Sequence, residues 1–335
     1  MLTASYHVIA GPHRKDDKRR PWFFTDKILK KIAEKGNLLM KRYQDVLLKM
    51  IVLTFKRLPF PFICRAGELI GTVLYRVLKE RREIGLANLE IAFPEKSREE
   101  REIILKRCWR NISKDMLEVV KYFVVSPDTV KERVSLIGIE NLKQCFAQNR
   151  GVIALSAHYG NFPVICRMLA LEGYPLAIIT AKMHNRVLNP MIPAVQRKTG
   201  IEPIPVNPGH RCVAKSLLWL KKGGVLFLQI DQNPSEEAGV PVDFFGRKLP
   251  TFRGPVVMAM RTGAAILPMF ITREKDDQHQ IVIEKPFVLK LTGNNEDDIR
   301  DSLHALSKIT EDHIRQAPSF WWWIHRRFRM AIHDK

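Results

Sequence analysis

The pattern that decides the fold lies in residues 151–163, which read Gly151-Val152-Ile153-Ala154-Leu155-Ser156-Ala157-His158-Tyr159-Gly160-Asn161-Phe162-Pro163. The apolar run predicts a buried strand over Val152–Ser156, and the segment from Val164 to Leu171 after the glycine turn has a helical pattern. His158 is therefore expected at the carboxyl end of a buried strand. Open α/β sheets place their reactive groups at that edge.

Strand and helix patterns alternate through the middle of the chain. The predicted strands are Val152–Ser156, Leu176–Thr180, Ile201–Val206, Val225–Ile230, Ile266–Ile271 and Ile281–Ile283. The predicted helices are Asn189–Thr199, Cys212–Lys221, Pro255–Thr262 and a late helix over Asp297–Gln316. This alternation predicts an α/β fold with a mostly parallel central sheet flanked by helices.

Helical patterns dominate the part of the chain that precedes the predicted sheet. The stretch from Val46 to Leu78 is apolar but carries several charged residues and two prolines, too many for a spanning helix of about 20 apolar residues. It predicts amphipathic helices that lie on a membrane, or a helical pair packed on the protein's own core. Ser97, followed three residues later by Glu100, predicts a capped helix start.

These patterns divide the chain into three parts. We expect residues 1–45 to form a basic N-terminal extension, residues 46–125 a membrane-associated helical region, and residues 126–330 an α/β domain. The amino terminus lacks the order of a basic region and then an apolar core, so no signal peptide is expected.

The balance of charge is the unusual bulk property. The 335 residues carry a formal net charge of +20, which predicts an acidic partner: nucleic acid, an anionic membrane or an acidic protein. No recognised nucleic-acid-binding motif is present, so nucleic acid is not the expected partner. The five cysteines are scattered without a C-x-x-C pair, so neither a metal centre nor dithiol chemistry is expected.

His158 and its turn form the first candidate site. Histidine ionises near neutral pH and suits a general base. Asn161 and the amides of the turn at Gly160 can donate hydrogen bonds to an oxyanion or a phosphate. A histidine that caps a helix or binds a loop carbonyl is the structural alternative.

A second polar cluster, Asp231-Gln232-Asn233-Pro234, directly follows the predicted strand Val225–Ile230. Clusters at the carboxyl ends of neighbouring strands converge on one cleft, so Asp231 and Gln232 are candidates to share a site with His158. The alternative is an ordinary Asx turn, for which these residue types are typical.

Two further clusters are rich in arginine. In the run from Asp243 to Pro255, Arg247 and Arg253 precede a predicted helix start, where guanidinium groups suit a phosphate, although surface charge also explains them. Arg186, which follows the predicted strand Leu176–Thr180, is a weaker candidate of the same kind. The aromatic and basic run Trp321–Arg329 suits a membrane headgroup layer, stacking on nucleic acid, or packing of the terminal segment on the core.

Taken in order, these clusters resemble the bacterial late acyltransferases of lipid A biosynthesis, the lauroyl- and myristoyltransferase-like members of the lysophospholipid acyltransferase superfamily. The resemblance covers roughly residues 50–329. The matching motifs are a helical segment that ends in Ala-Phe-Pro (Arg81–Pro94), a turn with His, Gly and Asn (His158, Gly160 and Asn161), Asp231-Gln232, Phe244–Arg247, and Trp321–Arg327.

The resemblance implies a glycerolipid acyltransferase-like fold and a reaction without cofactor. A fatty acyl chain would pass from a thioester of acyl carrier protein or coenzyme A to a hydroxyl of a lipid A precursor or a related anionic membrane lipid. His158 would take the hydroxyl proton, and amide donors would hold the oxyanion. The expected location is the cytoplasmic face of the bacterial inner membrane, with peripheral or monotopic attachment. The expected substrate-binding residues are Gly160, Asn161, Gln232, Arg247, Arg253 and Arg186.

One position departs from the pattern of this family. In this family the histidine is followed by four residues and then by an aspartate or glutamate, a His-x4-Asp/Glu motif. In this chain the position of the acid is occupied by Pro163. Three explanations are open: Asp231 substitutes for the acid as the second catalytic residue, a backbone carbonyl holds the imidazole, or the chain is a weakly active or non-catalytic lipid-binding relative.

Overall fold

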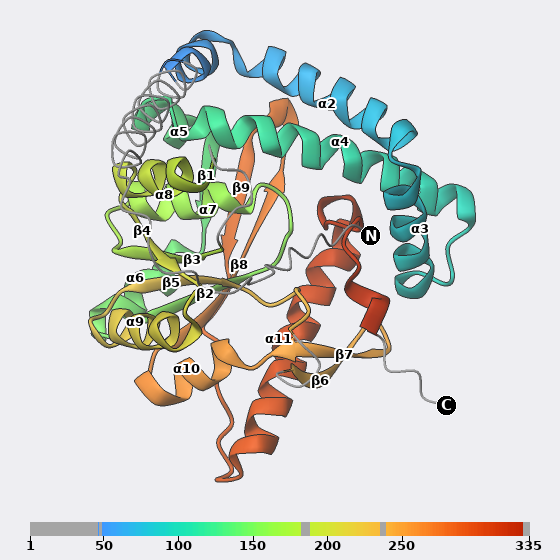
Figure 1. Cartoon of the computed structure of the whole chain (residues 1–335). Helices are drawn as coiled ribbons and strands as arrows, with labels where there is room; N and C mark the ends of the chain where they lie inside the picture. The colour runs from blue at the N-terminus through green and yellow to red at the C-terminus, as the bar shows by residue number, and fades with distance from the viewer. Residues whose placement is uncertain (1–45, 47–48, 182–187, 235–238, 331–335) are drawn as a thin grey trace, which may run out of the picture. The chain divides into compact units, whose positions relative to one another are not determined.

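The computed structural model describes residues 46, 49–181, 188–234 and 239–330 (Figure 1). From Val52 onward the chain forms one compact unit, so the described helices up to Tyr122 belong to the same unit as the sheet. Its strands are β1 (Val134–Ile137), β2 (Val152–Ser156), β3 (Leu176–Thr180), β4 (Ile201–Pro205), β5 (Val225–Gln229), β6 (Gly239–Phe244), β7 (Arg247–Phe252), β8 (Ala265–Arg273) and β9 (His279–Ile283).

The helices precede, connect and follow these strands. They are α2 (Phe60–Val77), α3 (Lys79–Ala92), α4 (Arg98–Tyr122), α5 (Pro127–Arg133), α6 (Ile139–Ala147), α7 (Phe162–Leu171), α8 (Leu188–Lys198), α9 (Gly209–Lys221), α10 (Gly254–Thr262) and α11 (Asn295–Gln316). Short 3₁₀ turns η3 (Pro318–Phe320) and η4 (Arg327–Met330) lie in the carboxyl-terminal segment.

The central sheet has seven strands in the order β1-β9-β8-β2-β5-β3-β4. The five strands from β8 to β4 are parallel to one another, whereas β9 pairs antiparallel with β8 and β1 runs with β9. The predicted mostly parallel α/β sheet is therefore confirmed. Strands β2 and β3 have the predicted bounds, and β4, β5, β8 and β9 differ from the prediction by a few residues at their ends.

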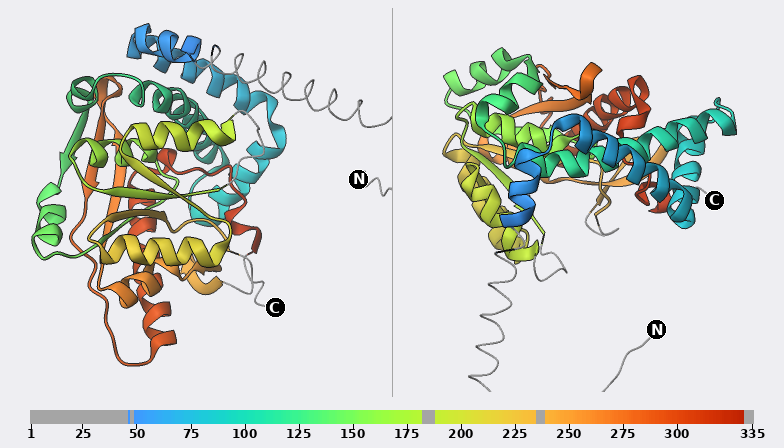
Figure 2. Two further views of the ribbon diagram at one scale, coloured as in Figure 1. Left: turned by 60° about the vertical axis from the view of Figure 1, so that its left-hand side comes forward. Right: turned by 90° about the horizontal axis from the view of Figure 1, so that it is seen from above.

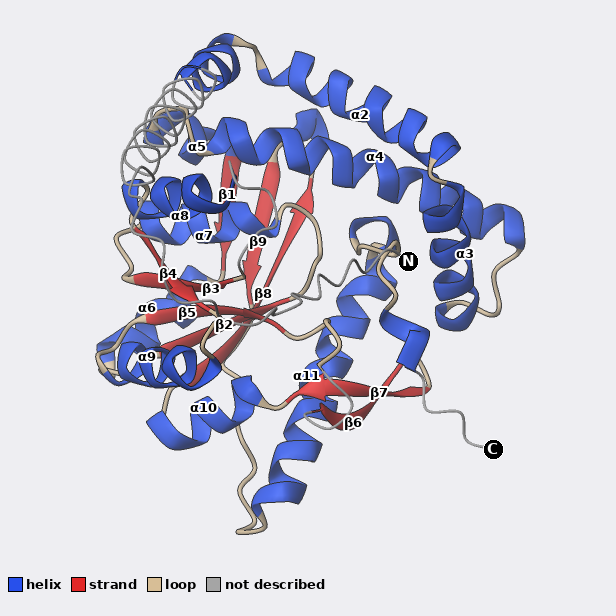
Figure 3. Ribbon diagram, in the orientation of Figure 1, coloured by secondary structure: helices blue, strands red, loops and turns tan. Residues whose placement is uncertain are grey.

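Both faces of the sheet are covered, which explains why β2 is buried throughout and apolar from Val152 to Leu155 (Figure 3). Val152 and Ala154 pack with residues of α7 on one face. Ile153 and Leu155 pack on the other face with residues of α9, α10 and α11. Alternate side chains of one strand thus enter two separate cores.

The position of β5 brings the two candidate clusters together. Although β5 follows β4 in the chain, it is inserted between β2 and β3 in the sheet. The loop after β2, which carries His158, therefore lies beside the loop after β5, which carries Asp231. A reversal of strand order of this kind opens a crevice at the carboxyl edge of a parallel sheet.

Helix α2 lies along α4 (Figures 1 and 2). The two backbones approach closely because α2 presents Gly67 and Gly71 to α4, where an added Cβ would lie 2.6 Å from Lys114 Cα and 2.5 Å from the Trp109 carbonyl oxygen. One face of α2 is therefore packed on α4. The predicted capping box of Ser97 and Glu100 at the start of α4 is also confirmed.

The opposite face of α2 is apolar and exposed. It consists of Phe62, Leu69, Ile70, Val73 and Val77. Of the helices in the described part of the chain, none combines the length and apolar character that a membrane crossing requires.

The hairpin β6–β7 differs from the sequence prediction. No strand was predicted in residues 239–253, only a helix start after Arg253, whereas β6 and β7 pair antiparallel across a two-residue turn at Phe245-Gly246. Both turn residues have positive φ, 50° and 71°, as a type I′ hairpin requires. Pro241 lies opposite Pro250 in this ribbon, and prolines inside a run argue against a strand when the sequence is considered alone.

Candidate active site

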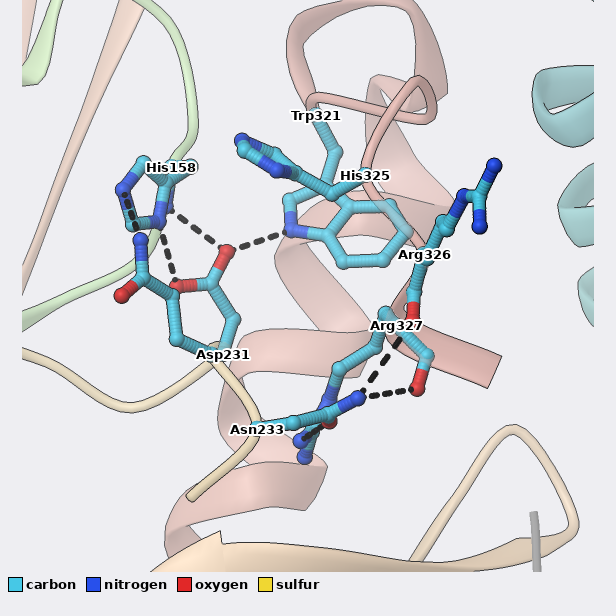
Figure 4. A pocket seen from close by; sticks show the side chains of 8 residues that line it. His158, Asp231, Asn233, Trp321, His325, Arg326 and Arg327 are labelled. Atoms are coloured by element: carbon cyan, nitrogen blue, oxygen red, sulfur yellow. Dashed lines mark hydrogen bonds and ion pairs between the residues drawn. The ribbon is translucent and has the colours of Figure 1, made fainter. Parts of the chain in front are cut away.

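The imidazole of His158 contacts the carboxylate of Asp231 at the carboxyl edge of the sheet (Figure 4). His158 Nδ1 lies 2.9 Å from Asp231 Oδ1, and the His158 backbone N–H donates to Asp231 Oδ2 at 2.8 Å. Trp321 Nε1 donates to the same Oδ2 at 2.9 Å. Both side chains are buried. The structure thus joins the two residues expected to form the catalytic pair.

The carboxylate of Asp231 is ionised in this setting. Burial alone would raise its pKa, but the adjacent His158 charge and the hydrogen bonds from His158 and Trp321 outweigh burial and lower the pKa of Asp231 to about 2. An ionised carboxylate only accepts hydrogen bonds, so Nδ1 of His158 carries a proton and donates it to Asp231; in the neutral form of this imidazole the lone pair lies on Nε2. The amide of Gln232, an exposed residue, donates to this Nε2 at 3.0 Å.

Aromatic rings enclose the imidazole of His158. The ring centroids of Phe162, Trp322 and His325 lie 5.2, 5.4 and 5.3 Å from its own. The Trp322 backbone N–H also donates to the carbonyl oxygen of His158 at 3.1 Å. Packing and the carboxylate together restrict the imidazole to one orientation.

A cavity of about 210 Å³ opens beside this pair. Its lining residues are His158, Asp231, Gln232, Asn233, Trp321, His325, Arg326 and Arg327 (Figure 4). Half of these residues belong to the carboxyl-terminal segment Trp321–Arg329. For this segment the sequence left three roles open: contact with a headgroup layer, stacking on nucleic acid, or packing on the core. Trp321 and Trp323 are fully buried, so packing is what the structure shows for them.

Arg327 is a buried cation at the floor of this cavity. It donates to the side chain of Asn233, to the Pro250 carbonyl oxygen at 2.8 Å and to Thr251 Oγ1 at 3.0 Å, and no carboxylate pairs with it among the described residues. Burial lowers the pKa of Arg327 to about 10, against the opposing effect of Asp231. Arg327 thereby ties the loop after β5 to strand β7.

The glycine turn supports His158 but does not point donors into the cavity. The Gly160 N–H donates to the Phe320 carbonyl oxygen at 2.9 Å. The Asn161 side chain is buried, and its Nδ2 lies 3.5 Å from Glu118 Oε2 of α4. Neither residue lines the cavity, which differs from their expected role as oxyanion donors. Pro163 stands in the first turn of α7.

Among the described residues, the arginines expected to bind acidic groups do not line this cavity. Arg247 is exposed in the β6–β7 hairpin. Arg253 precedes α10, and its guanidinium donates to both carboxylate oxygens of Glu296 at 2.6 and 2.8 Å. Arg186 lies outside the described residues.

A second buried charged cluster lies behind the turn. Asp115, Glu118 and His279 approach one another closely enough to offer ligands to a metal. However, Arg273 already donates to Asp115 at 2.5 Å and to Glu118 at 2.6 Å. Burial would raise the pKa of Glu118, but His279 and Arg273 together hold it well below its usual range. The chemistry of this cluster is that of an ion-pair network between α4, β8 and β9.

Replacing Gly160 by alanine is expected to lower the free energy of unfolding by about 3 kcal/mol or more. Gly160 has φ +54° and an added Cβ would lie 2.3 Å from the Ile271 carbonyl oxygen, so strain and a backbone clash combine. Urea unfolding measures the effect. Gly246→Ala is the matched control, because Gly246 also has positive φ (+71°) but open space around the new Cβ. Equal losses of unfolding free energy in the two variants would show that the clash with the Ile271 carbonyl oxygen does not contribute.

Comparison with known proteins agrees with the motifs. Residues 32–330 match the family model described as bacterial lipid A biosynthesis acyltransferase. The chain is 28% identical over 274 residues to the lipid A biosynthesis palmitoleoyltransferase of Escherichia coli (strain K12), covering 82% of this chain and 87% of the relative. It is 24% identical over 276 residues to the lauroyltransferase of that organism, with 82% and 87% covered.

A third relative is the lipid A biosynthesis myristoyltransferase of Escherichia coli (strain K12), 25% identical over 220 residues, with 66% of each chain covered. These matches confirm the resemblance that the ordered motifs indicated, and with it the expected enzyme class. The family model spans the helices α2 to α4, the sheet, both halves of the His158 and Asp231 pair, and the tryptophan-rich segment. The chain therefore belongs to the bacterial lipid A biosynthesis acyltransferase family.

Proposed function

We propose that this protein transfers a fatty acyl chain from a thioester to a hydroxyl of a lipid A precursor or a related membrane lipid, with His158 as general base. The observation that carries the proposal is the 2.9 Å contact of His158 Nδ1 with the ionised, buried carboxylate of Asp231. This contact supplies the orienting acid that Pro163 cannot provide. Asp231 acts through His158 and is a positioning residue.

The reaction begins when the acceptor hydroxyl takes the place of the Gln232 amide at His158 Nε2. The hydroxyl oxygen attacks the thioester carbonyl carbon as Nε2 accepts its proton, and Asp231 stabilises the resulting imidazolium. The carbon–sulfur bond then breaks, and the imidazolium returns the proton to the leaving thiolate. Base catalysis of this kind contributes about 10²–10⁴-fold in rate. The displaced amide of Gln232 remains beside the reacting carbon as a donor for the oxyanion.

The donor is expected to be acyl carrier protein or acyl-coenzyme A, and the acceptor an anionic membrane lipid. Both a carrier protein and an anionic membrane surface attract a chain of net charge +20. Arg247, Arg253 and Arg186 stay proposed contacts for acidic headgroups; of these, Arg247 and Arg253 do not line the His158 cavity. Nucleic acid is not a proposed partner, because no recognised binding motif supports it.

The location we propose is the cytoplasmic face of the bacterial inner membrane, with peripheral or monotopic attachment through residues 46–125. The exposed apolar face of α2 supports this, since five large apolar side chains on one helix face exceed the isolated apolar residues of ordinary surfaces. Arg65 and Arg76 on the same helix are exposed and suit anionic headgroups. The basic extension, residues 1–45, lies outside the described residues.

Substituting Leu69 by glutamate is expected to weaken binding to anionic vesicles by about 10-fold or more, because one leucine side chain buried in lipid is worth about 1.5–3 kcal/mol. Vesicle flotation or co-sedimentation measures the partition coefficient. Leu291→Glu is the matched control, because Leu291 is 61% exposed and Leu69 67% exposed, but Leu291 lies outside α2. If the two variants bind vesicles equally, the α2 face is not the membrane contact.

The function itself is tested with the purified full chain, a lipid A precursor, and acyl thioesters of both acyl carrier protein and coenzyme A. Mass spectrometry is expected to show an acceptor that has gained one acyl chain, with release of free thiol. Pro163 favours one alternative, a weakly active or non-catalytic lipid-binding relative. Lipid binding without transfer from either donor would establish that alternative instead.

A further inference from the structure

Helix α9 carries a row of cations on its outer surface. Arg211, Lys215 and Lys222 follow one another at intervals of four and seven residues, which places them on one side of the helix, and Lys221 lies next to Lys222. All four residues are exposed. From Arg211 to Lys222 the row extends for about 16 Å along the helix axis. Four positive charges therefore line the outer side of α9 over nearly its whole length.

The helix itself has no acidic residue to balance these cations. The sequence of α9, Gly209–Lys221, contains neither aspartate nor glutamate. In the part of the chain that the structure describes, none of the four cations pairs with a carboxylate. Helix α4 shows the usual arrangement, in which Glu102 lies one turn from both Arg98 and Lys106, at 3.7 and 3.3 Å. The charge of α9 is thus left open to a partner.

The spacing of the cations disfavours the helix when no partner is bound. Arg211 and Lys215 are four residues apart, and like charges at this spacing repel and destabilise a helix. Between Lys215 and Lys222 lies Leu218, which is 54% exposed. An apolar side chain among charged groups is the arrangement of a protein–protein interface, with an apolar centre and a polar rim. We call Leu218 and the four cations the α9 surface.

The α9 surface and the exposed apolar face of α2 belong to opposite sides of the central sheet (Figure 1). Phe60 of α2 packs in the same core as Val152 of β2. Leu220 of α9 packs in the other core, with Ile153 of β2. A membrane bound by the apolar face of α2 would therefore lie on the far side of the sheet from α9. This favours a macromolecule in the aqueous phase over lipid headgroups as the partner of α9.

The α9 surface begins at the edge of the sheet that carries the catalytic pair. Because α9 follows β4 and precedes β5, its amino-terminal end with Arg211 lies at the carboxyl edge of these parallel strands, and Lys222 lies at the amino edge. The helix packs on β5, the strand that leads to Asp231. A protein bound along α9 therefore reaches the edge where the cavity beside His158 opens.

We propose that the α9 surface docks the protein that carries the acyl thioester, by pairing its cations with carboxylates on an acidic helix of that carrier. Opposite charges across such a surface steer association and fix the orientation of the partner. The inference rests on the proposed function, because a thioester carrier is needed only by a chain that transfers acyl groups. It also selects a carrier protein as donor, since a coenzyme A thioester does not need a whole helix surface.

The test compares two donors with the full chain, palmitoyl-acyl carrier protein and palmitoyl-coenzyme A, with a lipid A precursor as acceptor. In the double variant Arg211→Glu/Lys215→Glu, kcat/KM with the carrier is expected to fall by about 10-fold or more, because repulsion replaces attraction. With coenzyme A it should stay within about 2-fold. At 1 M salt the effect on the carrier should shrink, since exposed charges are then screened within about 3 Å.

The matched control is Lys143→Glu/Lys275→Glu, which changes the net charge by the same amount. Lys143 is exposed on α6, and Lys275 is exposed in the turn between β8 and β9. The control should leave kcat/KM with both donors within about 2-fold. Equal losses with the two donors, or equal effects of the two double variants, would overturn the proposal. If Arg211→Glu/Lys215→Glu loses its thermal unfolding transition, Lys215→Ala decides, because alanine preserves the helix; an unchanged kcat/KM with the carrier then rejects the docking.

Calorimetry with unloaded acyl carrier protein separates this proposal from the proposed function, because binding requires no acyl transfer. Binding weakened about 10-fold by Arg211→Glu/Lys215→Glu, and unchanged in the control, supports the docking even if the chain transfers nothing. Transfer from palmitoyl-coenzyme A without any binding of the carrier rejects the docking and leaves the proposed function intact. If the variant instead loses binding to anionic vesicles while carrier binding is unchanged, α9 is a membrane contact and the proposal is overturned.

Discussion

Replacing His158 by alanine is expected to lower kcat/KM for acyl transfer by about 10²–10⁴-fold, which is the contribution of a positioned general base. Alanine removes the Nε2 lone pair that takes the acceptor proton and leaves Asp231 as a buried carboxylate with one fewer partner. Product formation by mass spectrometry, with each thioester donor in turn, measures the loss.

His304→Ala is the control for this substitution. His304 is 54% exposed, and its one ionic contact, with Asp243, is long at 3.8 Å. Its removal should leave kcat/KM within about 2-fold, since surface changes of this kind rarely alter a protein by more than about 0.5 kcal/mol. Transfer by His158→Ala at the rate of the control would exclude general base catalysis by this histidine.

Replacing Asp231 by asparagine is expected to reduce kcat by about 10³–10⁴-fold, because the substitution forces the wrong tautomer on His158. Oδ2 of Asp231 accepts two hydrogen bonds, from the His158 backbone N–H and from Trp321 Nε1. The asparagine oxygen must take that position, which turns its NH₂ toward Nδ1 of His158. The imidazole then accepts at Nδ1 and carries its proton on Nε2, where the acceptor hydroxyl needs a lone pair.

Steady-state kinetics separates this effect from a loss of structure. The loss should fall on kcat, with KM nearly unchanged, since Asp231 acts on the base and not on the bound lipid. Asp301→Asn is the matched control, because Asp301 is an exposed acid in the second turn of α11 and does not line the His158 cavity. Activity retained in Asp231→Asn would favour the second explanation for Pro163, in which a backbone carbonyl holds the ring.

The same variant also has a signature in the dependence of stability on pH. Because the folded-state pKa of Asp231 is lowered from 3.8 to about 2, its ionised form stabilises the fold above about pH 4. That contribution to the free energy of unfolding decreases as the pH falls from about 4 to about 2. Asp231→Asn should therefore flatten the unfolding free energy across this interval, as urea titrations at several pH values would show.

Local sequence patterns were sufficient for most secondary structure. The apolar run Val152–Ser156 gives β2 with its predicted bounds, since a strand covered on both faces must be apolar at every position. Ser97 and Glu100 start α4 through contacts three residues apart. Such features depend on neighbours in the chain. The hairpin β6–β7 was missed because its prolines mask the strand pattern and its turn begins with Phe245, which has positive φ.

The sequence by itself determined the fold class, the family motifs and the histidine at a strand end. Only the tertiary structure decided what holds that histidine, because Asp231 lies 73 residues further along the chain and reaches it through the insertion of β5 beside β2. The same holds for Trp321, which reaches Asp231 across 90 residues. Strand order and the docking of the terminal segment follow from burial of whole apolar faces, a property that no local pattern contains. This is why the carboxylate beside His158 comes from the loop after β5 and not from position 163, which is Pro163.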